Sequence, residues 1–118
     1  RDQPIPVYAE MGSVNPIFAF PKRLKNELVP LAQSFVGSLT LGAGQFCTNP
    51  GLIFVPRTLA ERFGNAISES IQDVAAAPML HEGIAESYYK SLNELQLRSE
   101  LEWVKVPDAK HLINASPA

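Results

Sequence analysis

Short apolar runs alternate along the chain with longer segments in which apolar residues recur every three or four positions. The runs at 17–20 and 51–56 are bounded by glycine or proline and are too short for helices, so they predict buried strands. The stretches 4–11 and 101–106 have a similar character and predict two further strands.

Three longer segments have the spacing of a helix face. The first face consists of Leu24, Leu28, Leu31, Phe35 and Leu39. The second consists of Leu59, Phe63, Ala66, Ile67, Ser70, Ile71 and Val74, and the third of Ile84, Tyr88, Leu92 and Leu95. Because proline costs ~3 kcal/mol in a helix interior but little in a first turn, Pro30 predicts a loose turn followed by a main helix over about 30–41. Thr58 and Glu61 have the spacing of a capping box that would begin the second helix.

The predicted order is strand, strand, helix, strand, helix, helix, strand. Strands that alternate with helices favour an α/β fold, with a largely parallel sheet and flanking helices. The 118 residues have the size of one small domain. Because Arg1 is not a methionine and the last residues have no clear pattern, we expect a piece of a longer chain, truncated at both ends.

The amino-acid composition disfavours several classes of function for this chain. The chain is 46% hydrophobic and 19% charged, with a net charge of −2, which is ordinary for a soluble globular protein. Without a basic patch, a nucleic-acid partner is not expected. No apolar run reaches the ~18 residues of a membrane span. A single cysteine forms no internal disulfide, and no Cys/His cluster has metal-ligand spacing, so we expect a reducing, cytoplasmic setting and no metal.

The single cysteine, Cys47, lies where the first long helix should end and the next strand begin. Gly42 and Gly44 precede it, and an Asn-Pro-Gly turn at 49–51 follows it. Glycines end helices and leave room for a ligand close to the backbone. A buried structural thiol is the competing interpretation, because cysteine is among the most buried residue types. A catalytic thiol would need a base or an electrostatic aid, since a free cysteine has a pKa of ~8.5.

Three residues are candidate bases. Glu10 ends a predicted strand before a glycine turn, and a partly desolvated carboxylate there suits proton transfer. His81 or His111 would instead pair with Cys47 in a small cysteine hydrolase, although a helix start and a surface tail explain these two residues as well. A non-catalytic domain with a buried Cys47 is the third interpretation.

Two motifs carry a family resemblance. The segment Ala9–Pro16, Ala-Glu-Met-Gly-Ser-Val-Asn-Pro, resembles the Glu-Leu-Gly-Gly-type motif of the aldehyde dehydrogenase superfamily. Gly-Gln-Phe-Cys at 44–47 resembles the Gly-Gln-x-Cys nucleophile motif of the same superfamily. Their order and separation also agree with the family. The similarity runs through essentially the whole chain, and it implies that residues 1–118 are part of an aldehyde dehydrogenase catalytic domain.

The resemblance implies a role for each motif residue. Cys47 would attack the aldehyde, the resulting thiohemiacetal would pass a hydride to NAD or NADP, and a thioester would remain. Glu10 would be the general base for thioester hydrolysis, the Cys47 N–H would give half of an oxyanion hole, and Gly12 would lie near the nicotinamide. Met11 and Ser13 depart from the common Leu and Gly of the motif.

The motif variants are most similar to bacterial enzymes that oxidise 2-oxoglutarate semialdehyde. NADP-dependent fatty-aldehyde dehydrogenases of luminous bacteria share much of the pattern and are the alternative. The chain has no Gly-x-Gly-x-x-Gly after a strand, so the cofactor-binding domain should be absent from it. We therefore expect the chain alone to bind no cofactor and to be inactive, and the parent enzyme to be a homo-oligomer.

Overall fold

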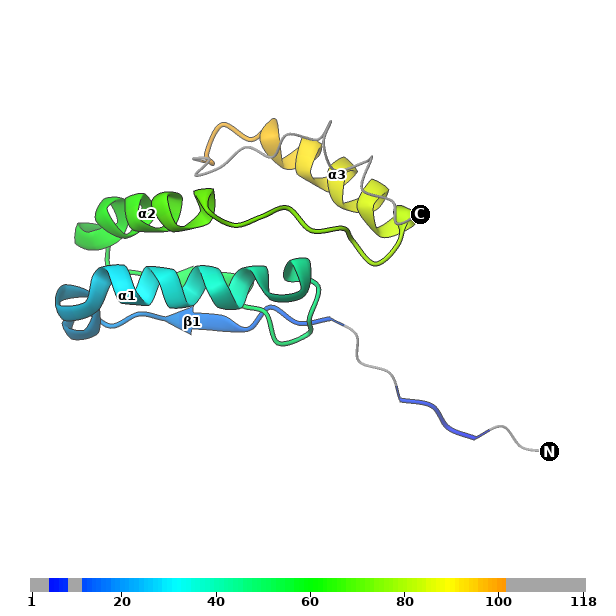
Figure 1. The fold of residues 1–118 in the computed structure, drawn as a ribbon, viewed down its shortest axis with the longest axis horizontal. Helices are drawn as coiled ribbons and strands as arrows, with labels where there is room; N and C mark the ends of the chain where they lie inside the picture. Colours follow the sequence, from blue (N-terminus) through cyan, green and yellow to red (C-terminus); the bar gives the residue numbers. More distant parts are fainter. Residues whose placement is uncertain (1–4, 9–11, 102–118) are drawn as a thin grey trace.

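The computed structural model describes residues 5–8 and 12–101. Its elements, in chain order, are β1 (Pro16–Phe18), α1 (Pro21–Thr40), the 3₁₀ turn η1 (Leu41–Gly44), β2 (Leu52–Phe54), α2 (Arg57–Gln72) and α3 (Glu82–Gln96). Figure 1 shows α1 and α2 side by side, with α3 beyond α2. The described part of the chain is therefore a small α/β arrangement.

The two strands form a parallel sheet in which Ile17 lies opposite Ile53 and Phe18 opposite Phe54. This agrees with the prediction of a largely parallel sheet. The predicted strand over 4–11 is wrong for residues 5–8, which are exposed and irregular, and its remaining residues lie outside the described ones. The predicted strand over 101–106 lies outside the described residues except for Leu101, which is irregular.

Helix α1 begins earlier than predicted. Residues from Pro21 onward are already helical, so the turn expected before Pro30 is shorter than predicted. Helical geometry is instead interrupted at one residue, Glu27, with φ −139° and ψ 40°. A proline ring clashes with the carbonyl four residues before it, here that of Asn26, and the kink at Glu27 relieves this clash. Pro30 thus lies in the first turn of a second helical segment, where proline is tolerated.

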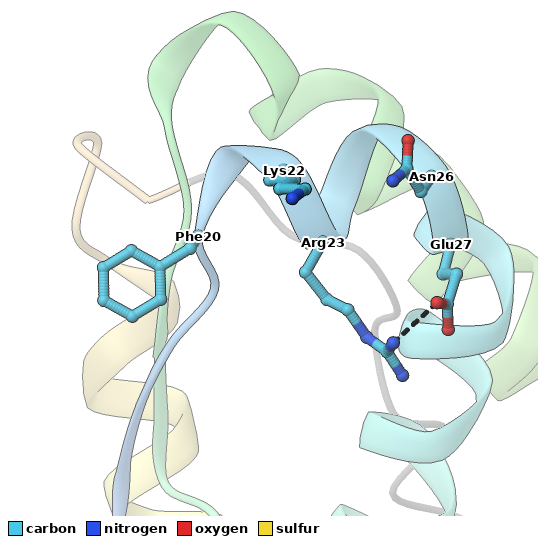
Figure 2. Close-up of a pocket in the computed structure, with 5 residues that line it drawn as sticks. All are labelled: Phe20, Lys22, Arg23, Asn26 and Glu27. Atoms are coloured by element: carbon cyan, nitrogen blue, oxygen red, sulfur yellow. Dashed lines mark hydrogen bonds and ion pairs between the residues drawn. The ribbon is translucent and has the colours of Figure 1, made fainter.

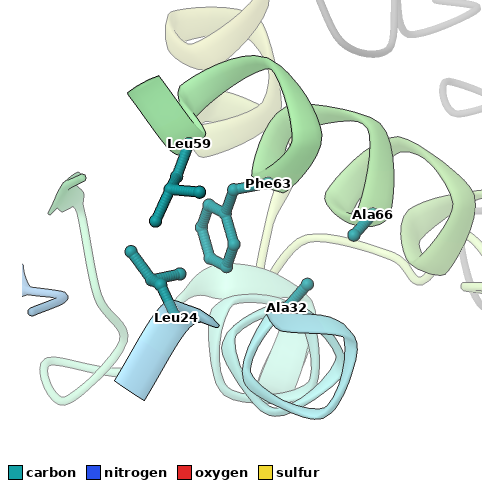
Figure 3. Close-up of a cluster of buried hydrophobic side chains, with 5 residues drawn as sticks. All are labelled: Leu24, Ala32, Leu59, Phe63 and Ala66. Carbon is teal, nitrogen blue, oxygen red and sulfur yellow. The ribbon is translucent and has the colours of Figure 1, made fainter. Parts of the chain in front are cut away.

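Helices α1 and α2 enclose the core. The buried cluster, drawn in Figure 3, consists of Leu24, Ala32, Leu59, Phe63 and Ala66. Ile53 and Val55, from β2 and the residue after it, pack against this cluster. Ala32 and Ala66 face each other across the helix pair (Figure 3), and their small side chains let the two backbones approach.

The start of α2 differs from the prediction. The helix begins at Arg57, with Pro56 as its N-cap and no side-chain cap, so Thr58 lies inside the first turn. The predicted capping box is therefore wrong. Pro56 has φ −59° and ψ 135°, an extended conformation that its ring already favours, and its carbonyl accepts the Leu59 N–H at 2.9 Å. The backbone at Pro56 thus sets the start of the helix without a polar side chain.

The second face of the sheet carries aromatic side chains. The rings of Phe18 and Phe54 stack with centroids 4.9 Å apart and planes 12° apart. Phe18 is 63% exposed and Phe54 50% exposed. Strand residues alternate between the two faces of a sheet, so Ile53 points to the core while Phe54 points away from it. Among the described residues, the stacked rings are left open to solvent.

Candidate functional site

Two segments meet at the amino ends of the parallel strands. The residues 12–15 lead into β1, and the loop 45–51 leads into β2. The Gly51 N–H donates to the Val14 carbonyl at 2.6 Å. A Cβ on Gly51 would lie 2.7 Å from that same oxygen, so only glycine allows this close approach. The pairing of β1 with β2 thus brings the segment that follows Glu10 beside the loop that holds Cys47.

Helix α1 ends just before Gly42 and Gly44, as predicted, and the backbone there is left-handed. The φ values are 60° at Gly42, 55° at Ala43 and 72° at Gly44. A Cβ at Gly42 would lie 2.8 Å from the ring of Phe46. The Phe46 ring therefore packs onto Gly42, so the space expected there for a ligand is filled by the chain itself.

Cys47 lies in a turn closed by the Asn49 N–H, which donates to the Phe46 carbonyl at 3.1 Å. The cysteine is free and exposed. The interpretation of Cys47 as a buried structural thiol is therefore wrong for this structure. An exposed thiol on a turn is accessible from solvent.

The carbonyl of Cys47 accepts hydrogen bonds from two side chains of the opposite segment. The Ser13 hydroxyl donates to this oxygen, and the Asn15 side-chain amide donates to it at 2.8 Å. Asn15 Nδ2 also lies 3.0 Å from the Asn49 carbonyl and 2.9 Å from Ser13 Oγ. We call Ser13 and Asn15 the Cys47 clamp.

A second asparagine ties the same turn to the end of α1. Asn49 Nδ2 lies 2.6 Å from the Ser38 carbonyl, 3.1 Å from that of Leu39 and 3.0 Å from that of Leu41. The last carbonyls of a helix have no partner within the helix, and Asn49 supplies one. Its Oδ1 is buried without a hydrogen-bond partner. The turn that holds Cys47 is therefore anchored to both α1 and the lead into β1.

Sequence reasoning missed the roles of Ser13, Asn15 and Asn49. One signal was present: Asn15 and Asn49 each precede a proline, and each of these Asn-Pro pairs stands just before a predicted strand. Asparagine tolerates left-handed backbone, as the φ of 43° at Asn15 requires, and hydrogen-bonds to nearby backbone groups. Two such pairs at the same sheet edge could have indicated that the asparagines bridge the two segments.

The histidine alternatives gain no support. His81 is the N-cap of α3, and its Nδ1 accepts the Ile84 N–H at 3.3 Å. This confirms the helix-start interpretation and occupies one of the two ring nitrogens that a base would use. His111 lies outside the described residues. Gln45, next to the nucleophile motif, accepts the Leu80 N–H at 2.8 Å and so ties the loop to the segment before α3.

The other predicted site residues can be placed only in part. Glu10 lies outside the described residues, as does Met11. Gly12 is described and exposed, and a Cβ built there would meet open space. Residues 5–8 and 12–101 hold no group of three His, Cys, Asp or Glu side chains that could bind a metal ion. Across that same range, no helix combines the length and apolarity needed to cross a bilayer.

An open hollow lies at the opposite end of α1 from Cys47. Figure 2 shows its lining: Phe20, Lys22, Arg23, Asn26 and Glu27. Arg23 and Glu27, two of the lining residues, form an ion pair at 2.6 Å along α1. Open α/β sheets usually bind ligands at the carboxyl ends of their strands, and the hollow lies on that side. A helix of 20 residues is about 30 Å long, so this hollow lies far from Cys47.

Two curated relatives match most of the chain. The chain is 45% identical over 96 residues to alpha-ketoglutaric semialdehyde dehydrogenase 2 of Azospirillum brasilense. The aligned residues make up 80% of this chain and 18% of that protein. The chain is also 35% identical over 115 residues to alpha-ketoglutaric semialdehyde dehydrogenase of Acinetobacter baylyi. This second alignment makes up 97% of this chain and 22% of that protein. No protein-family model matches the chain.

These matches confirm the resemblance drawn from the Glu10 and Cys47 motifs: the chain is similar to semialdehyde dehydrogenases. The chain spans about a fifth of the length of these relatives. The resemblance therefore concerns one segment of each relative.

Proposed function

We propose that the chain is part of the catalytic domain of an NAD(P)-dependent dehydrogenase that oxidises 2-oxoglutarate semialdehyde. The observation that carries the proposal is the exposed Cys47 on a turn whose carbonyl is hydrogen-bonded to the segment that follows Glu10. The names of the two relatives supply the substrate. An oxidoreductase that acts on fatty aldehydes is the second candidate, on the motif resemblance alone.

The proposed chemistry begins at the Cys47 sulfur. The thiolate adds to the aldehyde carbon, a C–S bond forms, and the carbonyl oxygen becomes an alkoxide that the Cys47 N–H helps to stabilise. NAD or NADP, held by other parts of the enzyme, would supply the oxidising power that turns this adduct into a thioester, and the residues of this chain would hold the adduct on Cys47. Glu10 then takes a proton from water, which attacks the thioester, and the C–S bond breaks to release the carboxylate product and the thiolate.

The cofactor itself does not fit the described residues. No glycine-rich turn between a strand and a helix is present in them to hold its phosphates, since η1 follows a helix and Gly51 precedes a strand. The open space at Gly12 leaves room near Cys47 but supplies no binding group. In this proposal the cofactor-binding domain, and the contacts of a homo-oligomer, belong to parts of the enzyme beyond this chain.

The test uses the longer enzyme that we propose contains this chain. Wild type should reduce NAD or NADP in the presence of 2-oxoglutarate semialdehyde, whereas Cys47→Ser should not. Glu10→Gln should give a burst of reduced cofactor, followed by slow turnover, because hydride transfer precedes hydrolysis. Mass spectrometry should then detect an acyl group on Cys47.

The matched control is Glu69→Gln, which removes an exposed carboxylate from α2. It should retain full turnover and accumulate no acyl group. Full turnover by Cys47→Ser would overturn the proposed function. Wild-type rates in Glu10→Gln would remove Glu10 from the mechanism but leave Cys47 in place. The chain of 118 residues alone should not reduce either cofactor.

A further inference from the structure

We infer that Ser13 and Asn15, the Cys47 clamp, are positioning residues that fix the main chain at the nucleophile. The inference rests on the proposed function, because it assigns these residues to the reaction of Cys47. The two side chains bind the Cys47 carbonyl oxygen and leave the thiol exposed. They touch the peptide of the nucleophile, so they act through Cys47.

The chemistry of the neighbouring groups determines which atoms of the clamp donate hydrogen bonds and which accept them. Two neighbours of Asn15 Nδ2 are carbonyl oxygens, those of Cys47 and Asn49, which only accept hydrogen bonds. The side-chain amide must therefore turn its N–H groups toward them. Ser13 accepts from Asn15 and donates to Cys47, so the hydroxyl relays between the amide and the same carbonyl. The three groups form one connected network.

Ser13 stands where the resembled motif has a glycine. A glycine would leave the Cys47 carbonyl with one side-chain donor from this segment, whereas the serine provides a second. The departure from the common motif therefore adds a contact to the nucleophile turn.

The backbone at Asn15 explains why asparagine suits this position. Its φ of 43° lies in the left-handed region, which asparagine and glycine adopt at low cost. Glycine would keep the backbone but lose the donors. Aspartate would keep the shape but, when ionised, has no donor and repels both carbonyl oxygens. These two replacements separate the role of the backbone from the role of the amide.

The clamp matters because it holds the Cys47 peptide itself, whereas the Asn49 side chain holds the same turn to the end of α1. Three successive left-handed residues, Gly42, Ala43 and Gly44, separate α1 from the nucleophile turn, and Cys47 is exposed. A nucleophile displaced by about 1 Å can lose roughly 100-fold in rate. Holding the Cys47 carbonyl fixes the peptide plane from which the sulfur projects, before any substrate arrives.

The test places a nitroxide spin label on Cys47 of the chain and records its electron paramagnetic resonance spectrum. Asn15→Gly and Asn15→Asp should increase the mobile component at least about twofold while the helical circular dichroism signal is unchanged, and Ser13→Ala should give a smaller increase. Asn65→Asp and Ser34→Ala remove equivalent groups from exposed positions on α2 and α1 and should match wild type.

The rate at which Cys47 is alkylated in the unlabelled chain provides a second test, because this rate responds to nearby charge. The carboxylate of Asn15→Asp should disfavour the Cys47 thiolate and slow its alkylation by iodoacetamide by about threefold at low salt. The difference should shrink in 1 M salt, because added ions screen the two charges. Asn65→Asp carries the same charge far from Cys47 and should alkylate at the wild-type rate.

Enzyme kinetics can show whether Asn15 positions Cys47 or only helps the chain to fold. In the longer enzyme, Asn15→Gly should lower kcat about tenfold per titrated thiol and leave KM within about twofold. Spectra of folded Asn15→Gly and Ser13→Ala identical to wild type, or a kcat per thiol that is unchanged, would overturn the inference. The spin-label result does not depend on the proposed function. If the spin-label spectra confirm the clamp but Cys47→Ser retains turnover, the proposed function is overturned and the clamp is not.

Discussion

The α1–α2 core and the Cys47 turn are held together by opposite kinds of contact. The core consists of apolar side chains from two helices, among them Leu24 and Phe63, which are almost fully buried. The Cys47 turn contains an exposed thiol and is held by polar side chains that bind backbone carbonyls, chiefly Asn15 and Asn49. Burial stabilises the first region, and directed hydrogen bonds shape the second.

The difference has a physical reason. A packed core tolerates few changes of volume, but it does not fix the orientation of one exposed peptide. Hydrogen bonds contribute less free energy each, yet they specify direction. A turn that must present a reactive group to solvent cannot be buried, so its geometry has to come from side chains that bind the backbone.

The largest expected effect is in the core. Phe63 is 2% exposed, so Phe63→Ala removes a buried ring and should cost about 3–5 kcal/mol of the free energy of unfolding. That is a large part of the stability of a typical small domain. Urea unfolding followed by circular dichroism measures the loss. The matched control, Leu97→Ala, changes a residue that is 87% exposed and should stay within about 0.5 kcal/mol of wild type. Equal losses in the two variants would contradict the comparison.

A smaller effect is expected at the second anchor of the Cys47 turn. Asn49→Ala removes the donor for three carbonyls at the end of α1 and should cost about 1–3 kcal/mol. Hydrogen exchange measured by mass spectrometry should rise in residues 38–51 and stay at wild-type levels in α2, because the opening is local. Asn65→Ala is the control and should leave both regions protected. A uniform rise across α1 and α2 would mean that Asn49 supports the core as well.

The same contrast explains what the sequence could predict. The α2 face was predicted correctly at Leu59, Phe63 and Ala66, because the helix period places buried residues on one side. On α1 the predicted stripe was only partly right. Leu24 is buried, but Ala32 and Val36, which the stripe left out, are buried as well. Small residues at a helix crossing are hard to recognise by hydrophobicity alone.

The site was predictable where a motif is local in sequence. Cys47 and its glycines were found in one stretch, and the end of the first long helix followed from those glycines. The clamp was not found, because Ser13 lies 34 residues from Cys47 and meets it only after β1 pairs with β2. Contacts of this kind depend on the register of the sheet, which hydrophobic spacing does not specify.

The smallest effect concerns α3, which contributes no buried residue to the core. Tyr89 on this helix has a hydroxyl that is shielded from water and has no hydrogen-bond partner. Burial, and then the neighbouring Tyr88, raise the pKa of the Tyr89 phenol above its usual value of 10.0. The folded chain therefore keeps this proton at a pH where the unfolded chain has lost it. Stability from Tyr89 should be complete below pH 10 and fall as the pH rises through the higher pKa of the folded state.

Urea unfolding between pH 9 and pH 12 tests this sign. Wild type should lose more stability across this range than Tyr89→Phe, which has no phenol to ionise at that position. Tyr88→Phe should give an intermediate slope, because it removes the second cause of the raised pKa and leaves the burial. The Tyr88 and Tyr89 rings meet edge to face at 5.4 Å, and phenylalanine preserves that packing. Equal slopes in wild type and Tyr89→Phe would mean that water reaches the hydroxyl, and α3 would then resemble the exposed Cys47 turn more than the core.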